Sequence, residues 1–69
     1  MATVNEKLGA RIRELRRMKN VTLEELAFET KTDYSYLQQI ESGKRNPSVK
    51  RVAAIATALK IKLRDLFDF

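Results

Sequence analysis

Residues 22–48 of this chain read TLEELAFETKTDYSYLQQIESGKRNPS, and this segment decides the fold. Thr22 and Glu25 have the spacing of a capping box, in which the side chain of each residue accepts a hydrogen bond from the backbone N–H of the other at a helix start. Asp33 is a favourable N-cap for a second helix, since its carboxylate can accept from amides of the first turn. Only about one turn of chain separates the two helices, so the segment predicts two short helices that cross steeply.

Apolar residues at helical spacing predict three more helices around this pair. The first covers about Asn5–Met18, and Asn20 is expected to end it. Gly43 tolerates a positive φ and ends the helix that Asp33 begins, and Ser48 caps the next one. The expected fold class is therefore all-α, a compact five-helix bundle. The apolar positions of this pattern are Val4, Leu8, Ile12, Leu15, Leu23, Leu26, Ala27, Leu37, Ile40, Val52, Ile55, Ala56, Leu59, Leu63, Leu66 and Phe67.

Length and composition exclude several classes of protein. A chain of 69 residues suits one domain with no second domain, and at this size only about 60% of the unfolded surface is buried. The chain has no Cys and no His, which excludes disulfides, imidazole bases and the usual zinc sites, so we expect no metal and no cofactor. No apolar run approaches the ~20 residues of a membrane span and no signal peptide is visible, so a cytoplasmic location is expected.

The charges are distributed in blocks, within a formal net charge of +5 that suggests a polyanionic partner. Residues 7–19 carry six cations against one acid, and residues 42–64 carry seven cations and no acid. Residues 20–41 carry five acids and one cation. This layout separates charge attraction from base discrimination, as contacts to DNA generally do. The alternative is a set of solvated helix faces.

A family resemblance rests on the pattern Thr22-x3-Leu26-Ala27 followed by Leu37-x2-Ile40-Glu41-x-Gly43-x3-Pro47-Ser48. This pattern resembles the phage repressor and Cro family of helix-turn-helix domains, the lambda repressor-like DNA-binding domains. The match covers about residues 8–67, with the helix-turn-helix motif at about 23–42. Because the chain ends at Phe69, we expect it to be similar in build to small stand-alone members, in particular the controller proteins of restriction-modification systems.

The resemblance implies that the helix beginning at Asp33 lies in the major groove of double-stranded DNA. Its base-reading residues would be Tyr34, Ser35, Gln38 and Gln39. A Gln amide can pair bidentately with adenine, and no Lys or Arg lies on this face, so direct reading of guanine from this helix should be weak. The alternative is that these side chains are only the polar side of a surface helix.

The resemblance also implies phosphate contacts from residues beside this helix and from the amides at the start of the helix that Thr22 begins. One such residue has a second possible role, because the ring of Tyr36 could instead be half-buried and close the core. Arg16 and Glu41 occupy positions that form a structural ion pair in similar proteins. The phosphate-binding residues would be Tyr36, Lys44, Arg45 and Asn46.

Four positions depart from the family pattern. Leu23 stands where a Gln usually contacts the DNA backbone, so one contact is expected to be missing. Lys31 and Lys60 replace customary glycines, and a left-handed backbone at Lys31 would cost roughly 1–2 kcal/mol relative to Gly. Lys62 stands where a Ser normally caps the last helix, so this helix is expected to depend on a partner for stability.

The last seven residues carry four large apolar side chains, more than a thin core can absorb. Leu66 and Phe67 are expected to complete the core, and Leu63 and Phe69 to form the interface of a homodimer. A two-fold dimer would place two recognition helices about 34 Å apart, one turn of B-DNA.

The expected function is a sequence-specific transcriptional regulator that binds a pseudo-palindromic operator as a dimer, with no evident small-molecule effector. The alternative is a protein-interaction module, such as an antitoxin or a coactivator-like adaptor, that uses the apolar C-terminus. An enzyme is not expected, because no nucleophile, base and orienting group are spaced to act together.

Overall fold

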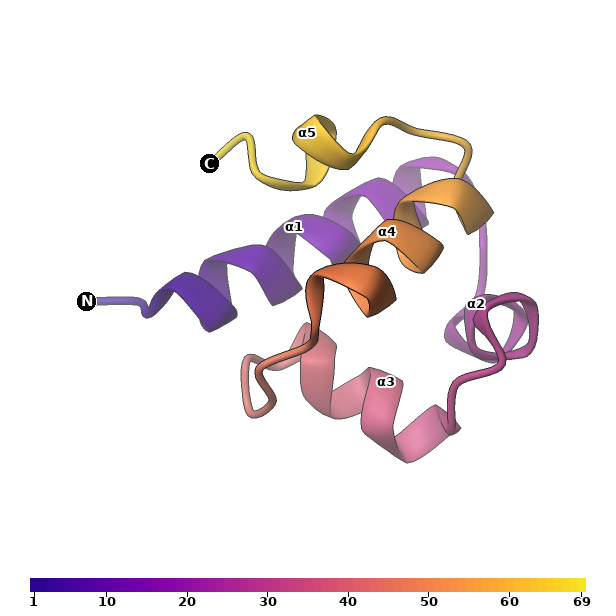
Figure 1. Ribbon diagram of the computed structural model, residues 1–69, viewed down its shortest axis with the longest axis horizontal. Helices are drawn as coiled ribbons and strands as arrows, with labels where there is room; N and C mark the ends of the chain where they lie inside the picture. Colours follow the sequence, from indigo (N-terminus) through magenta and orange to yellow (C-terminus); the bar gives the residue numbers. More distant parts are fainter.

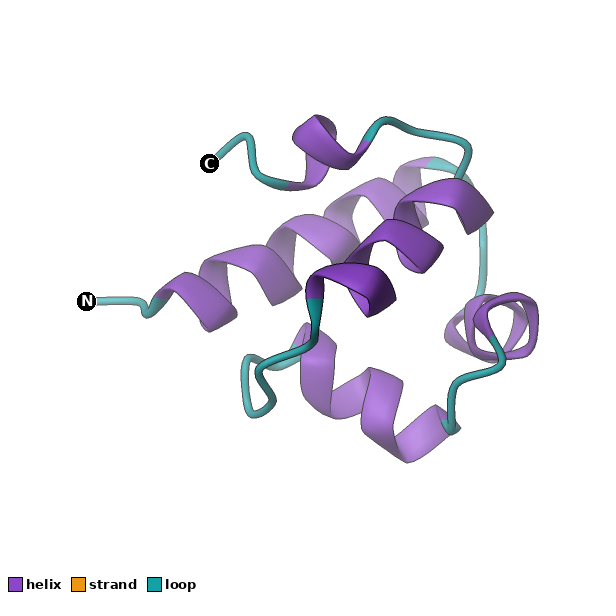
Figure 2. Ribbon diagram, viewed as in Figure 1, coloured by secondary structure: helices purple, strands orange, loops and turns teal.

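The computed structural model describes all residues, 1–69, and contains five helices and no strand (Figure 2). The all-α, five-helix prediction is therefore confirmed. None of the helices is both long enough and apolar enough to cross a membrane. The helices are α1 (Val4–Met18), α2 (Leu23–Thr30), α3 (Tyr34–Glu41), α4 (Val49–Ala58) and α5 (Leu63–Leu66).

The helices pack in an arrangement that leaves one side of α3 uncovered. α1 packs against α3 and α5, α2 packs against α3 and α4, and α4 packs against α5. In Figure 1, α3 lies across one end of the molecule and α5 lies at the opposite end, with α1 and α4 between them. α2 is seen end-on while α3 runs across the view, which is the steep crossing that the short turn predicts (Figure 1).

The core comes almost entirely from the positions that the helical periodicity predicts. Two predictions were wrong. Val4 is 66% exposed, because the first turn of α1 extends beyond the helices that cover its middle (Figure 1). Phe67 follows the last turn of α5 and is 45% exposed, whereas Leu66 is fully buried. The buried apolar residues are Leu8, Ile12, Leu15, Leu26, Ala27, Leu37, Ile40, Val52, Ile55, Ala56, Leu59 and Leu66.

Side-chain caps fix where the helices begin. Thr22 and Glu25 form the expected capping box at α2, and Asp33 and Ser48 cap α3 and α4. The sequence prediction missed the second capping box, Thr3 with Glu6, which starts α1 one residue before Asn5. At α5 the carboxylate of Asp65 accepts from the backbone N–H of Lys62 at 3.0 Å, but a lysine side chain cannot accept the reciprocal bond.

Four helices end through the same left-handed reversal of the chain. The φ angles are 57° at Asn20, 52° at Lys31, 81° at Gly43 and 58° at Lys60. After α3, the N–H of Gly43 donates to the carbonyl of Ile40, and the next amide donates to the carbonyl three residues before the cap. The backbone at Lys31 is left-handed, which is the condition on which the expected strain at this residue depended.

The crossing of α1 over α3 requires a residue without a side chain. Gly9 is buried, and a Cβ added there would lie 2.6 Å from the carbonyl oxygen of Glu41 and closer still to that of Ile40. These are backbone atoms of α3, so the two helices would have to move apart. The sequence prediction gave Gly9 no role, although a glycine inside an amphipathic helix is a signal of close packing.

A buried ion pair joins the same two helices. The guanidinium of Arg16 donates to both carboxylate oxygens of Glu41, at 2.7 and 3.1 Å, and a third N–H donates to the carbonyl of Val21 at 2.9 Å. Glu41 is 4% exposed and Arg16 is 9% exposed. Arg13 approaches the same carboxylate at 3.3 Å from a more exposed position. The pair therefore fixes the C-terminal end of α3 on α1.

Replacing Glu41 with Ala should lower the free energy of unfolding by about 3–5 kcal/mol, because it leaves the buried guanidinium of Arg16 without a counter-charge. Denaturant unfolding followed by circular dichroism measures this cost. Arg13→Ala is the matched control, because the Arg13 side chain is more exposed and its removal leaves Glu41 paired with Arg16, so it should cost at most about 1 kcal/mol. A loss for Glu41→Ala no larger than the loss for the control would contradict the assigned role of the pair.

Replacing Lys31 with Gly should raise the melting temperature by a few degrees. Relief of the left-handed strain, about 1–2 kcal/mol, exceeds the roughly 0.4–1 kcal/mol that a glycine costs through the freedom of the unfolded chain. Lys19→Gly is the control, because Lys19 has a φ of −88° and no strain to relieve. A fall in melting temperature for Lys31→Gly would show that the reversal is not strained.

Candidate nucleic-acid interface

The exposed side of α3 is polar, and its buried side is anchored to the core. Leu37 and Ile40 are buried together with Glu41, which places the opposite face of the helix in solvent. Three of the four residues assigned to base reading, Tyr34, Ser35 and Gln38, are exposed on this helix. The structure thus brings the base-reading candidates to one end of the molecule.

The fourth base-reading candidate, Gln39, is half-buried and already has a partner. The Nε–H of Arg45 donates to its Oε1 at 2.6 Å, across the reversal that ends α3. The sequence prediction assigned Arg45 to phosphate and did not foresee this contact. The contact depends on the path of the loop after Gly43, so spacing along the chain gives no indication of it.

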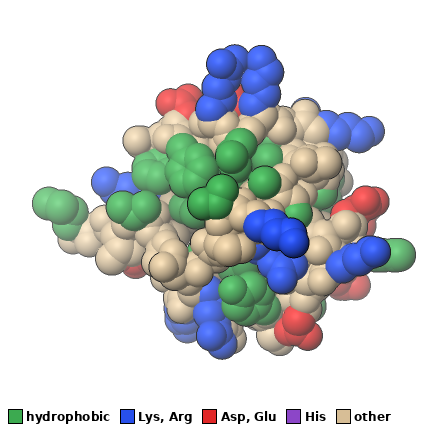
Figure 3. Space-filling view, viewed as in Figure 1, with side chains coloured by type: hydrophobic (Ala, Val, Ile, Leu, Met, Phe, Trp, Pro, Cys, Tyr) green, Lys and Arg blue, Asp and Glu red, His purple; other side chains and the backbone are tan.

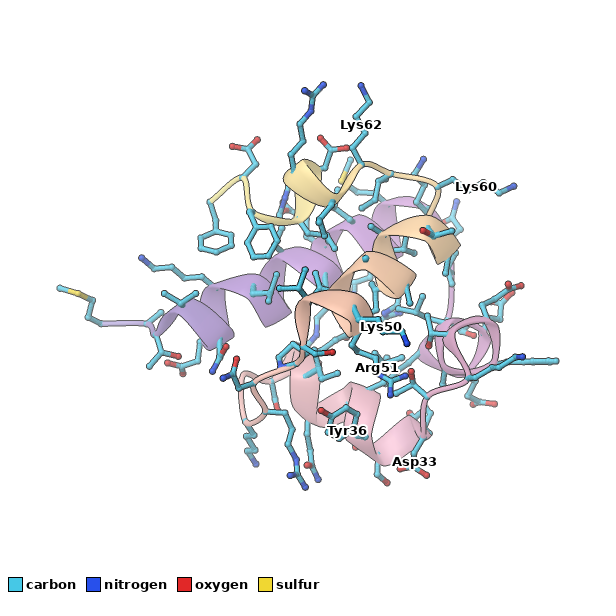
Figure 4. All side chains as sticks on the ribbon, viewed as in Figure 1. Asp33, Tyr36, Lys50, Arg51, Lys60 and Lys62 are labelled. Carbon is cyan, nitrogen blue, oxygen red and sulfur yellow. The ribbon has the colours of Figure 1, made fainter.

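Tyr36 lies between two guanidinium groups. Its ring is half-buried against the core, and the guanidinium carbons of Arg45 and Arg51 lie 5.5 and 5.9 Å from the ring centroid. The ring therefore packs against the core, as the second expectation for Tyr36 has it, and it also lies beside cations that border α3; its contact with phosphate stays a prediction. Figure 4 shows Tyr36 on α3 next to Arg51 and Lys50 at the start of α4.

The sequence prediction overlooked Arg51. Its Nη1 donates to the hydroxyl of Thr32 at 2.7 Å, and Thr32 is buried in the turn between α2 and α3. Arg51 thus links α4 to the helix-turn-helix. A signal was available, because Lys50 and Arg51 place two cations in the first turn of α4, where the helix dipole favours acids.

The loop after α3 supplies further cations. Lys44, Arg45 and Asn46 are all exposed, directly after the reversal at Gly43. In the space-filling view, Lys and Arg side chains lie at the end of the molecule where this loop and α3 lie, and others lie at the opposite end near α5 (Figure 3). The face that would meet a phosphate backbone therefore combines a polar helix with a basic border.

The acids gather on a different helix. Glu24, Glu25 and Glu29 are exposed on α2 around Phe28, which is 73% exposed. The backbone N–H of Thr22 donates to the carboxylate of Glu25, and this hydrogen bond holds the pKa of Glu25 below its ordinary value. No three acidic or other metal-ligating side chains are placed so that they could hold a metal ion together.

The C-terminal apolar residues lie at the other end of the molecule. Leu63 is 36% exposed and Phe69 is 54% exposed, and the rings of Phe67 and Phe69 lie 6.3 Å apart. In Figure 3 hydrophobic side chains gather where α5 and the C-terminus lie. The patch includes Phe67, which the sequence prediction assigned to the core.

Comparison with known proteins identifies the family. A helix-turn-helix family model matches residues 12–66. The control protein C.BamHI of Bacillus amyloliquefaciens is 39% identical over 62 residues, which are 88% of this chain and 76% of that protein. The match confirms the resemblance to helix-turn-helix domains that the sequence carries.

Two solved structures are similar over nearly the whole fold. The restriction-modification controller protein C.AhdI from Aeromonas hydrophila has a TM-score of 0.87 and 45% identity, over 90% of this chain and 94% of that chain. The biofilm regulator SinR in complex with DNA has a TM-score of 0.82 and 32% identity, over 88% of this chain and 98% of that chain.

Replacing Thr32 with Val, which has nearly the same shape, should lower the free energy of unfolding by about 1.5–3 kcal/mol, because the hydrogen bond from Arg51 is charge-assisted. Thermal and denaturant unfolding measure the loss. Thr57→Val on the exposed side of α4 is the control and should change stability by no more than about 0.5 kcal/mol. Equal stability of the two variants would show that Arg51 does not fasten α4 to the turn.

Proposed function

This chain belongs to the helix-turn-helix family, and we propose that it is a DNA-binding transcriptional regulator that binds a short pseudo-palindromic operator as a homodimer in the cytoplasm. One observation carries the proposal: the polar side of α3 faces outward at the end of the molecule, and cations border it on the loop after α3 and on α4. α3 would lie in the major groove while these cations contact the strands on either side.

The contacts divide into two kinds. Tyr34, Ser35, Gln38 and Gln39 read base edges, with Ser35 and Gln38 the most directly placed because they are exposed and without partners among the side chains. Contacts to phosphate fix the register and orientation of the protein and carry no sequence information. They come from Tyr36, Lys44, Arg45 and Asn46, which lie beside α3 or on the loop after it.

A homodimer would form through the apolar patch at α5. Leu63 and Phe69 are exposed at the end of the molecule away from α3, so a contact there leaves both recognition helices accessible. Exposed apolar side chains gathered in one place commonly mark an interface. The absence of a reciprocal cap at Lys62 is consistent with a short helix that gains stability from a partner.

Control of a restriction-modification system is the more specific proposal. Two of the similar proteins, C.BamHI and C.AhdI, are controller proteins, and this chain covers 76% and 94% of their lengths. A regulator of this kind needs no effector pocket, because its occupancy of the operator follows its own concentration. The adjacent genes would identify the system.

An interaction module is the second candidate, favoured by the exposed Leu63, Phe67 and Phe69. Such a module would bind another protein through this patch and would select no DNA sequence. The experiment that tests the first proposal therefore also separates the two candidates.

Selection from random duplexes with the purified protein should enrich an inverted repeat whose half-sites lie about 10 bp apart, centre to centre. Each phosphate neutralised should contribute about 0.9 to the steepness of the plot of log affinity against log salt. Lys44→Ala should therefore reduce this slope by about that amount, on the selected duplex and on unrelated duplexes alike. Fluorescence anisotropy at several salt concentrations measures the slope.

Lys62→Ala is the matched control, because Lys62 lies at the end of the molecule opposite Tyr36 (Figure 4). It removes the same charge from the chain and should leave the slope unchanged. Equal slopes for Lys44→Ala and the unmodified protein would contradict the assignment of the loop to phosphate. Enrichment of no sequence would favour the interaction module.

A further inference from the structure

The side chain of Gln39 is held in one orientation by a charged donor. A glutamine amide offers an oxygen that accepts and an NH₂ group that donates, and the orientation of the amide decides which of the two faces a ligand. Here the Nε–H of Arg45 donates to Oε1 of Gln39 at 2.6 Å. Hydrogen bonds from an ionised donor are roughly twice as strong as neutral ones, so the oxygen is the end committed to the protein.

Arg45 is itself fixed by two further features. Its guanidinium carbon lies 5.5 Å from the centroid of the Tyr36 ring, within the range of a cation–π interaction. The loop that carries it is folded back by the reversal at Gly43, where the N–H of Lys44 donates to the backbone carbonyl of Gln39 at 2.9 Å. The loop therefore contacts Gln39 twice: Arg45 donates to its side chain, and Lys44 donates to its backbone carbonyl.

We propose that Arg45 is a positioning residue that turns the NH₂ group of Gln39 toward the bases, so that Gln39 selects guanine and not adenine. The inference rests on the proposed function, because it assigns the specificity of the same DNA-binding face. It reverses the expectation from the sequence alone, in which a glutamine on α3 pairs with adenine.

The chemistry of the base edges gives this preference. Guanine presents two acceptors in the major groove, N7 and O6, which match the two hydrogens of an NH₂ group. Adenine presents N7 beside an NH₂ donor, so bidentate pairing needs the amide oxygen at the base edge as well, whereas the hydrogen bond from Arg45 directs that oxygen toward the loop. The two outer nitrogens of the Arg45 guanidinium keep their N–H groups, and these can still contact a phosphate.

The experiment measures the ratio of affinities for two duplexes that differ by guanine or adenine at one position. The position is located in the selected operator as the one whose base preference is lost when Gln39 is replaced with Ala. The unmodified protein should prefer guanine there, on the order of tenfold. Arg45→Ala should bring the ratio of guanine affinity to adenine affinity close to one or below it. The double variant, Arg45→Ala with Gln39→Ala, should have the same ratio as Gln39→Ala alone.

The ratio separates positioning from general binding. Loss of a phosphate contact by Arg45 weakens both duplexes equally and leaves the ratio unchanged. Tyr36→Phe is the matched control, because it keeps the ring beside Arg45 and should keep the guanine preference. Gln39→Glu has only acceptors to present, so its preference should move to cytosine, whose N4 amino group donates.

Three results would overturn the inference. If Arg45→Ala binds less tightly but keeps the guanine preference, Arg45 does not act through Gln39. If Gln39→Ala keeps the base preference at every operator position, while Arg45→Ala loses a guanine preference at one of them, Arg45 reads that base directly. If the unmodified protein prefers adenine at the position that Gln39 reads, the orientation of the amide is wrong. Enrichment of no operator at all would instead refute the proposed function on which the inference depends.

Discussion

The close crossing of α1 and α3 is the constraint on which the rest of the structure depends. Gly9 lets the two backbones approach, and the buried pair of Arg16 and Glu41 fixes the end of α3 against α1. A charge pair in the interior is favourable only in one geometry, because a displaced partner would leave an uncompensated charge. With its inner side fixed in this way and by Leu37 and Ile40, α3 can only present its polar side to solvent.

The packing of the helices also places exposed cations, acids and apolar side chains on different surfaces. Cations lie beside α3, acids lie around Phe28 on α2, and exposed apolar residues lie at the far end near α5. The cations beside α3 would attract a polyanion to that face, and the acids of α2 would repel it from theirs, although exposed Lys62 and Arg64 add positive charge near α5. The proposed DNA-binding face and the proposed subunit contact therefore lie on different surfaces, so the proposed dimer would leave the recognition helices uncovered.

The sequence predicts what is local and misses what tertiary contacts create. Periodicity and caps predict the five helices. Lys31 stands where the family usually has glycine, and the backbone there is left-handed. The exposure of Val4 and Phe67 could not be predicted, since it depends on whether another helix reaches the end of the element. The contact of Arg45 with Gln39 depends on a loop path that neither residue specifies.

The central claim is that the polar side of α3 enters a DNA groove, and amide chemical-shift mapping with the selected operator duplex tests it most directly. We expect the largest changes at Ser35 and Gln38 and in the loop after Gly43, with small changes at α5. Large changes confined to residues 63–69, with α3 unaffected, would contradict it.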